Sequence, residues 1–240
     1  MATPVPAMTF YQMKGSCSIV PHILLYHLDL PFRAIPMATD ANGKYAAADG
    51  SFTHADYVKI NPTGYVPALK LGDGTVIAEM PAVLSYIVNL SLESGSATHV
   101  KKKEETARLL GRTALEKAQV AQWLAYLSGT LHSLGFAAWW KPYRFVDDHE
   151  ESYGAVQKKG RAVIETAFAR IEQGLGGKQY MIGEEMTVVD LNVYVFYRWG
   201  RQIQIEMGEK YKEYTRIAKR IEGLEAVRKV LEVEGLKSCF

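Results

Sequence analysis

A short hairpin-like segment constrains this chain more than any other part of it. Residues 61–79 read NPTGYVPALKLGDGTVIAE. The Asn-Pro-Thr-Gly start is turn sequence, in which the proline disfavours helix and Gly64 accepts the positive φ of a tight turn. Two apolar runs follow, residues 66–71 and 75–78, and the Asp73-Gly74 pair between them is typical of a primed hairpin turn. The segment therefore predicts two antiparallel strands.

The end of this hairpin has the features of a site for a small zwitterionic peptide. A cis bond between Val66 and Pro67 would turn the backbone N–H and C=O of Val66 outward, where an extended peptide can pair with them. Spacing alone favours trans, because only a few per cent of X–Pro bonds are cis. The backbone N–H of Met80 would lie at a helix N-terminus, which favours a carboxylate. Glu79 beside it would take a ligand ammonium group.

Composition narrows the class of protein further. The 240 residues suffice for one large or two small domains, and a hydrophobic share of 48% is ordinary for a globular protein. The net charge of +2, without a basic stripe, argues against a nucleic-acid partner. No apolar run reaches the ~18 residues of a membrane span, residues 1–8 do not resemble a signal peptide, and two cysteines are too few for a disulfide framework. We therefore expect a cytoplasmic protein with neither a nucleic-acid nor a membrane partner.

The start of the chain places a cysteine at a helix N-terminus. Residues 1–7 predict a loose arm, residues 8–12 a short strand, and residues 19–30 a helix whose apolar positions recur at helical spacing. Ser16 or Ser18 would cap this helix. The helix N-terminus would favour a thiolate and lower the pKa of Cys17. The alternative is that Cys17 is a small buried hydrophobic side chain.

The next segments complete a first domain, residues 1–92. Residues 30–37 predict a second strand, bounded by prolines and therefore outermost on one side, and residues 80–92 predict a helix. Residues 40–57 predict a mobile loop over the ligand, with weak helical character. Lys44 would reach a ligand carboxylate from this loop, although a surface lysine is more often only solvated.

Helical patterns follow residues 91–99, a polar stretch that we expect to link two domains. They cover residues 104–134, 152–175, 187–207 and 211–233. Strands followed by helices predict an α/β domain and then an all-α domain, residues 101–240. Thr187 and Asp190 have the spacing of a capping box, with a role in folding and none in chemistry.

The hairpin motif, with Thr-Val-Ile-Ala-Glu as its return strand, resembles the glutathione-binding half of the cytosolic glutathione S-transferases. The capping box is similar to the one in their buried helix, so the resemblance extends over both domains. It implies the fold of that family: an α/β thioredoxin-like N-terminal domain with a mixed four-stranded sheet, then an all-α C-terminal domain. It also implies that glutathione binds as a co-substrate, without a metal, at Val66, Pro67 and Glu79. Many members have Ser or Gly where this chain has Met80, which leaves only a backbone N–H for the γ-glutamyl carboxylate.

Two further motifs resemble the beta class or a related fungal or bacterial type. Gly-Ser-Cys-Ser at residues 15–18 is similar to the Gly-x-Cys-Ser of that class, in which the cysteine lies near the glutathione sulfur. His132 stands where the class has a histidine that donates toward the glutathione thiolate, although a helical histidine taken alone is more often structural. Ala125 stands where the class often carries an asparagine, which reduces the polar support for His132.

The resemblance implies a glutathione transferase with a role in detoxification, and it leaves two chemistries open. A hydroxyl of Ser18 or Tyr11 that stabilises the glutathione thiolate would favour conjugation; Tyr11 is the weaker candidate because its side chain would point into the sheet core. A mixed disulfide between Cys17 and glutathione would favour thiol transfer. The catalytic candidates are therefore Cys17, Ser18, His132 and Tyr11.

A small hydrophobic electrophile is the expected second substrate. Trp139, Trp140 and Tyr143 would form an apolar wall for it, although core packing explains these aromatic residues equally well. The resemblance also implies a homodimer. The alternative function is a non-catalytic binding or regulatory module, because one fold serves many functions.

Overall fold

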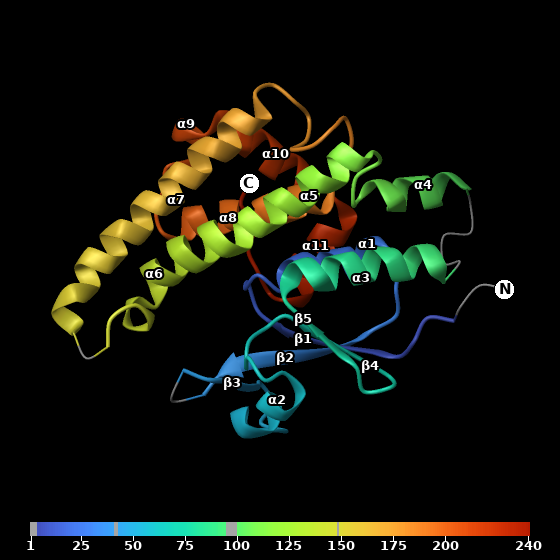
Figure 1. Ribbon diagram of the computed structural model, residues 1–240, viewed down its shortest axis with the longest axis horizontal. Helices are drawn as coiled ribbons and strands as arrows, with labels where there is room; N and C mark the ends of the chain where they lie inside the picture. Colours follow the sequence, from blue (N-terminus) through green and yellow to red (C-terminus); the bar gives the residue numbers. More distant parts are fainter. Residues whose placement is uncertain (1–3, 41–42, 95–99, 148) are drawn as a thin grey trace. The chain divides into compact units, whose positions relative to one another are not determined.

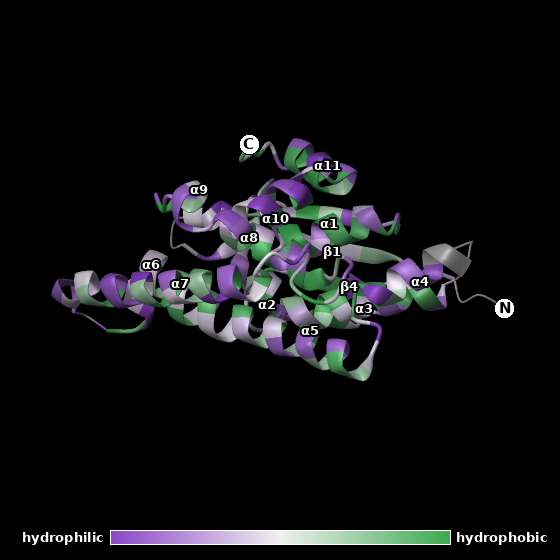
Figure 2. Cartoon of the chain, turned by 90° about the horizontal axis from the view of Figure 1, so that it is seen from above, coloured by the Kyte–Doolittle hydropathy of each residue, from purple (hydrophilic) through white to green (hydrophobic). Residues whose placement is uncertain are grey.

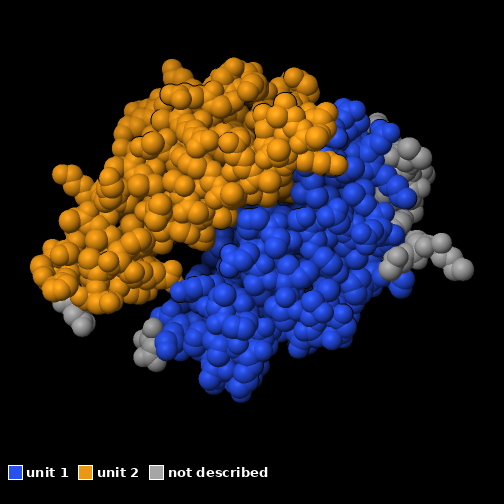
Figure 3. Space-filling view, in the orientation of Figure 1, with its two compact units in different colours: residues 1–112, 220–240 blue, residues 113–219 orange. Residues whose placement is uncertain are grey.

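The computed structural model describes residues 4–40, 43–94, 100–147 and 149–240. The chain forms two compact units, residues 1–112 with 220–240 and residues 113–219 (Figure 3). The first unit therefore combines the predicted N-terminal domain with α4 (Val100–Arg108) and with the end of the chain. The predicted link at residues 91–99 lies largely outside the described residues, as does the start of the predicted arm at residues 1–7.

A mixed sheet of five strands forms the centre of the first unit, in the order β3-β2-β1-β4-β5. Its strands are β1 (Met8–Met13), β2 (Arg33–Thr39), β3 (Tyr45–Ala47), β4 (Ala68–Leu71) and β5 (Val76–Ala78). β1 is parallel to β2 and antiparallel to β4. β4 and β5 form the predicted hairpin, whose turn is closed by the N–H of Leu71 on the carbonyl of Thr75 at 2.8 Å. The thioredoxin-like sheet is confirmed.

The short strand β3 is the difference from the expected four-stranded sheet. It pairs with the outer edge of β2, so β2 is not outermost as predicted. Two hydrogen bonds lie beside this pairing: the N–H of Asp40 donates to the carbonyl of Lys44 at 2.7 Å, and the Asp40 carboxylate accepts from the N–H of Lys44 at 2.9 Å. The described part of residues 40–57 therefore forms a strand and the start of α2 (His54–Ile60) in addition to loops.

Helices cover both faces of this sheet (Figure 1). α1 (Ile19–His27) and α3 (Met80–Glu93) lie on one face and α2 lies on the other. β1 alternates accordingly, because Phe10 contacts the ring of His22 in α1 whereas Tyr11 contacts the ring of Tyr57 in α2. α11 (Glu225–Val233) packs on α1, and Figure 2 shows it with apolar and hydrophilic sides.

The second unit is built from helices. They are α5 (Ala114–Tyr126), the π-helix η1 (Leu127–Phe136), α6 (Ala137–Trp140), η2 (Pro142–Arg144), η3 (Glu150–Ser152), α7 (Tyr153–Leu175), α8 (Val188–Gln202), α9 (Met207–Lys210) and most of α10 (Lys212–Glu222). The single helix predicted at residues 104–134 is interrupted at Gly111, whose φ of 93° lies in the left-handed region. In the part of the chain that the structure describes, no helix has the length and apolar character to cross a membrane.

Asp190 ties the start of α8 to the loop before it. Its carboxylate accepts hydrogen bonds from the N–H of Met181 at 2.8 Å, from the N–H of Thr187 at 2.7 Å and from the hydroxyl of Thr187 at 3.0 Å. The Thr187 hydroxyl accepts in turn from the N–H of Val189 at 3.3 Å. The predicted capping box is therefore present, and both of its side chains are buried.

We expect Asp190→Ala to lower the free energy of unfolding of the second unit by about 3 kcal/mol, because it leaves two buried N–H donors unpaired. Urea unfolding followed by tryptophan fluorescence measures this loss, since all four tryptophans, Trp123, Trp139, Trp140 and Trp199, belong to this unit. Glu116→Ala is the matched control: Glu116 completes a similar box with Thr113 at the partly exposed start of α5, and its loss should cost about 1 kcal/mol. An equal loss of unfolding free energy in Asp190→Ala and Glu116→Ala would contradict the idea that burial makes the Asp190 cap more important.

Candidate active site

Three segments of the first unit meet at one end of the sheet. Tyr11 in β1 pairs with Ala68 in β4, and Ala68 pairs with Ala78 in β5. Since paired strands advance together, the residues just beyond these pairs gather at one edge. They are the end of β1, the Val66-Pro67 peptide and the Glu79-Met80 junction. The sheet register therefore brings together the three segments that the sequence predicts for a binding edge.

Two buried side chains hold the loop that carries Val66 and Pro67 in place. The Val66-Pro67 bond is cis, as hypothesised. The carbonyl of Tyr65 accepts from the amide of Asn61 at 2.7 Å and from the hydroxyl of Tyr57 at 2.8 Å. Asn61 and Tyr57 are both buried, so the position of this loop is fixed by core residues.

Cys17 lies against this loop. It stands two residues before α1, and its thiol donates to the carbonyl of Val66 at 3.5 Å. Cys17 is 7% exposed, so it is buried against the loop. The structure therefore brings together the cysteine and the cis-proline loop, which lie 49 residues apart in the sequence.

Ser18 is the residue before α1, but its side chain does not cap that helix. Its hydroxyl donates to the carbonyl of Met13 at 3.2 Å and accepts from the N–H of Met13 at 3.0 Å. The Ser16 hydroxyl lies 2.7 Å away and acts as a donor to Ser18 when Ser18 donates to Met13. The Ser18 hydroxyl thus closes the turn after β1, and it would have to leave Met13 in order to donate to a bound thiolate.

A buried carboxylate from the end of the chain supports the same turn. Glu234 accepts from the N–H of Gly15 at 2.8 Å through Oε2, and its Oε1 lies 2.7 Å from Nδ1 of His22 in α1. The side chains of Glu234 and His22 are fully buried. Neither residue carries a local sequence signal for this role, because they lie 212 positions apart and meet only in the folded unit.

Glu79 and Met80 begin α3 at the other side of the edge. Glu79 is exposed and has a φ of 65°, a left-handed conformation that costs a residue with a side chain about 1–3 kcal/mol and is typical of ligand-binding positions. The Met80 side chain is buried in the core, so only its backbone faces the edge. Met80, where many family members have Ser or Gly, is therefore compatible with binding of a ligand through the backbone N–H.

Two of the predicted residues lie elsewhere in the first unit. Lys44 is exposed, and its backbone N–H donates to the carboxylate of Asp40. Tyr11 faces the α2 side of the sheet, where its ring contacts Phe52 and Tyr57. Burial raises the pKa of Tyr11, an effect partly offset by the positive charge of Arg33. The roles of Lys44 and Tyr11 stay predictions.

His132 belongs to the π-helix η1 of the second unit. Its ring contacts Trp199 at 5.2 Å and Phe196 at 6.1 Å, both in α8. Burial among these rings lowers the pKa of His132 to about 4, and the charges of Arg144 and Lys141 add to the effect. The imidazole is therefore neutral near pH 7, with one N–H donor and one acceptor nitrogen.

The aromatic candidates of the second unit differ in their surroundings. Trp140 packs against Phe136 and Trp199, each at 5.0 Å, and remains 39% exposed. Tyr143 is exposed. Trp139 instead lies under the guanidinium of Arg161, at 5.6 Å from its ring. Trp140 and Tyr143 thus keep exposed aromatic surface, whereas the ring of Trp139 packs against Arg161 of α7.

The sheet order, the cis-proline loop and the cysteine beside that loop place the first unit in the class of thioredoxin-like domains. Two family models match the chain: "Glutathione S-transferase, N-terminal domain" at residues 16–90 and "Glutathione S-transferase, C-terminal domain" at residues 137–225. Together with the relatives described next, they show that this chain belongs to the glutathione S-transferase family. In the described residues, no group of three or more His, Cys, Asp or Glu side chains is arranged to hold a metal ion.

Named relatives cover most of the chain. A glutathione S-transferase-like protein of Aspergillus aculeatus is 30% identical over 183 residues, which are 73% of this chain and 77% of that protein. Glutathione S-transferase GstA of Escherichia coli O157:H7 is 25% identical over 230 residues, 96% of this chain and all of that protein. The structure of a glutathione S-transferase from Xylella fastidiosa has the same fold, with a TM-score of 0.76, 22% identity and coverage of 96% of this chain and 100% of that one.

We expect Glu234→Gln to speed the alkylation of Cys17 by about tenfold, because the loss of one hydrogen bond to the turn is worth about 1.4 kcal/mol. The rate is measured with iodoacetamide and mass spectrometry in a Cys239→Ser background, which removes the only other thiol. Glu222→Gln is the control, since Glu222 binds the N–H of Cys239 in the chain terminus instead of the turn. An unchanged rate in Glu234→Gln would show that the turn does not depend on this carboxylate.

We expect the pKa of about 4 for His132 to make the second unit less stable in acid. A lowered pKa in the folded state gives stability that is complete above pH 6.5 and is lost as the pH falls toward 4, by up to about 3 kcal/mol. Tryptophan-monitored unfolding of the wild type and of His132→Gln at several pH values should show the difference between the two proteins shrink across this window. An imidazole that titrates near pH 6.5 by NMR would contradict the prediction.

Proposed function

We propose that this protein is a glutathione transferase, which joins the glutathione thiol to a small hydrophobic electrophile. The observation that carries the proposal is the hydrogen bond from the Cys17 thiol to the carbonyl of Val66 at 3.5 Å. This hydrogen bond places the Cys17 thiol beside the sheet edge at Val66, which can pair with an extended peptide. The membership in the glutathione S-transferase family supports glutathione as that peptide.

Glutathione would bind along this edge through its backbone and its two ends. The Val66 carbonyl has two lone pairs, so it can accept from a peptide N–H while it accepts from Cys17. The γ-glutamyl carboxylate would lie at the N–H of Met80, at the start of α3, and its ammonium group at the carboxylate of Glu79. Lys44 is the candidate for the glycyl carboxylate.

Conjugation requires the glutathione thiol to lose its proton. The thiolate then attacks an electrophilic carbon, a carbon–sulfur bond forms, and the leaving group departs with the electron pair. We keep His132 as the candidate residue for stabilising the thiolate, because its imidazole is neutral and the Ser18 hydroxyl is occupied by Met13. A donor of this kind lowers the pKa of the thiol, although it adds no positive charge to stabilise the anion.

Thiol transfer is the second activity that we propose. The Cys17 thiolate would attack the glutathione sulfur of a mixed disulfide between glutathione and another thiol, form its own mixed disulfide with glutathione, and release the other thiol as a thiolate. A second glutathione thiolate would then attack the glutathione sulfur of the mixed disulfide and restore Cys17. Conjugation and transfer use the same glutathione position, which supports one protein with both activities.

Trp140 and Tyr143 are the side chains that we propose for the electrophile, because they keep exposed aromatic surface. Trp139 would contribute less, since Arg161 covers its ring. Apolar walls discriminate weakly among hydrophobic ligands, so we expect a broad range of electrophiles. We also propose that the enzyme is a cytoplasmic homodimer.

The glutathione site is tested by Glu79→Gln. We expect the KM for glutathione in the conjugation of 1-chloro-2,4-dinitrobenzene to rise about tenfold or more, because a hydrogen bond to a charged group is worth about 1.5–3 kcal/mol. Glu93→Gln is the matched control, since Glu93 is an exposed acid at the opposite end of the same helix. An equal KM in the two variants would remove Glu79 from the site.

Cys17→Ala separates the two chemistries. We expect a glutathione adduct in the intact mass of the wild type after incubation with oxidised glutathione, and none in Cys17→Ala. If Cys17→Ala still conjugates, Cys17 acts in thiol transfer alone. If conjugation is lost, Cys17 acts in both reactions. Binding to immobilised glutathione without turnover of any electrophile would instead support the non-catalytic module.

A further inference from the structure

One buried amide in the first unit has no hydrogen-bond partner, and it lies near the end of β1. Gln12 is 5% exposed, and its amide oxygen is buried with no partner among the described residues. The amide nitrogen makes no hydrogen bond with a described residue either. Buried polar side chains in proteins are nearly always hydrogen-bonded, so this unpaired amide needs a physical explanation.

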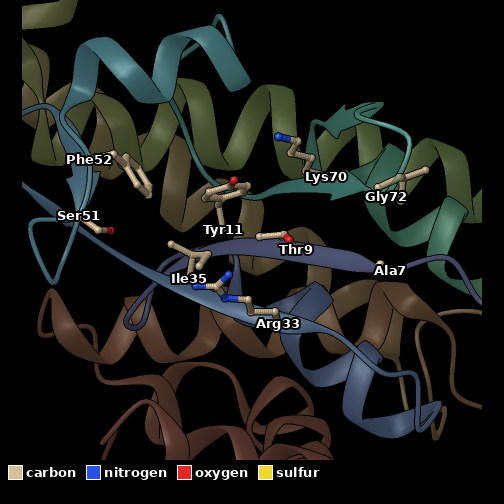
Figure 4. Close-up of a pocket in the computed structure, with 10 residues that line it drawn as sticks. Ala7, Thr9, Tyr11, Arg33, Ile35, Ser51, Phe52, Lys70 and Gly72 are labelled. Carbon is tan, nitrogen blue, oxygen red and sulfur yellow. The ribbon is translucent and has the colours of Figure 1, made fainter.

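The alternation of β1 sets the direction of this side chain. Thr9 and Tyr11 line a hollow on the α2 side of the sheet (Figure 4). The residues between and after them therefore project to the other face, where Phe10 meets the ring of His22 in α1. Gln12 belongs to this second set, so its side chain lies on the side of the sheet that α1 covers.

The strand register sets the position of Gln12 along the edge. β1 pairs with β4 as far as Tyr11 and Ala68. The next step of the same register brings Gln12 to the level of Pro67, beside the cis peptide. Neighbouring strands lie about 4.8 Å apart, and a long side chain also reaches the diagonal positions. The Gln12 amide is therefore within reach of a ligand that pairs with Val66.

We propose that the side-chain amide of Gln12 donates a hydrogen bond to the sulfur of bound glutathione and stabilises the thiolate. This inference rests on the proposed transferase function and adds a residue of the first unit to it. The glutathione cysteine would pair with Val66, beside the Cys17 thiol that donates to the same carbonyl. A thiolate only accepts hydrogen bonds, and a hydrogen bond to a charged group is stronger than one between neutral groups.

The hydroxyl and thiol groups of the neighbouring turn already have other partners. The Ser18 hydroxyl donates to the carbonyl of Met13, and the Ser16 hydroxyl lies 2.7 Å from that of Ser18. The Cys17 thiol donates to the cis-proline loop. Gln12 is thus left as a buried side chain at this edge whose N–H groups have no protein acceptor among the described residues.

Packing alone does not explain an amide at this position. Met8 and Phe10 precede Gln12 on the same face of the strand, and both are buried apolar residues. A leucine has nearly the size of glutamine and would fill the space without the desolvation of an unpaired amide. The amide therefore destabilises the free protein, and a hydrogen bond to a ligand would offset this cost.

The test measures the pKa of the thiol of bound glutathione, from the pH dependence of the ultraviolet absorption of the thiolate. We expect Gln12→Leu to raise this pKa by about one unit and to lower kcat with 1-chloro-2,4-dinitrobenzene up to about tenfold near neutral pH. Below the pKa of the thiol, the Kd for glutathione should be equal in the two proteins, because the protonated thiol does not need the donor. A damaged site would instead lose affinity at every pH.

Two further variants separate the charge effect from the shape of the side chain. Gln12→Glu keeps the size but places a negative charge beside the sulfur, so the pKa of the bound thiol should rise further than in Gln12→Leu. Gln173→Leu is the matched control, because it makes the same change at an exposed position of α7. Its bound thiol should titrate as in the wild type.

Thermal unfolding without glutathione tests the structural alternative. We expect Gln12→Leu to be at least as stable as the wild type, because it removes an unpaired buried amide. A clear loss of stability would make Gln12 a structural residue and would overturn the proposal.

The remaining outcomes separate this proposal from the proposed function. A wild type that conjugates, with the same thiol pKa in Gln12→Leu, would overturn the role of Gln12 alone. A pKa shift of Cys17, measured by its alkylation, without a shift for bound glutathione would assign the amide to the other sulfur and overturn the proposal as well. A wild type that binds no glutathione would remove the proposed function and this inference together.

Discussion

The central strand β1 is hydrogen-bonded along both edges, to β2 and to β4. Its alternating side chains are therefore committed to opposite faces, with Phe10 against α1 and Tyr11 against α2. A shift by one residue would exchange the faces of every side chain in the strand. The same register aligns the end of β1 with Val66-Pro67 and Glu79-Met80, and it aligns Thr9 with Arg33 and Lys70. The proposed active site thus depends on one set of backbone hydrogen bonds.

Each unit also depends on a buried carboxylate that joins two segments, which are far apart in the sequence for Glu234 and nearby for Asp190. Glu234 connects the end of the chain to the turn before Cys17 and to α1, and Asp190 connects the start of α8 to the loop at Met181. A buried carboxylate is stable only when donors surround it, and burial raises the pKa of Asp190 to about 6 in spite of the hydrogen bonds that it accepts. These groups hold a specific geometry, which nonspecific apolar packing does not provide.

Local sequence determined those features whose signals are short. The turn residues and the Asp73-Gly74 pair predicted the hairpin of β4 and β5, and the spacing of Thr187 and Asp190 predicted the cap of α8. The cysteine at the start of α1 and the helical second unit also followed from local pattern. In each case the physical preference acts between residues a few positions apart. The similarity of the hairpin, the Gly-Ser-Cys-Ser segment and the capping box to known motifs then indicated the family.

Only the tertiary structure decided which distant residues meet. β3 is a three-residue strand, too short for a periodic signal, and it forms because β2 offers a free edge. The contacts of Cys17 with Val66 and of Glu234 with Gly15 span 49 and 219 positions, and nothing in either local sequence encodes them. Arg33 and Lys70 likewise come to flank Thr9 only after three strands pair. Chain folding brings such groups together through burial and register, which are properties of the whole sheet.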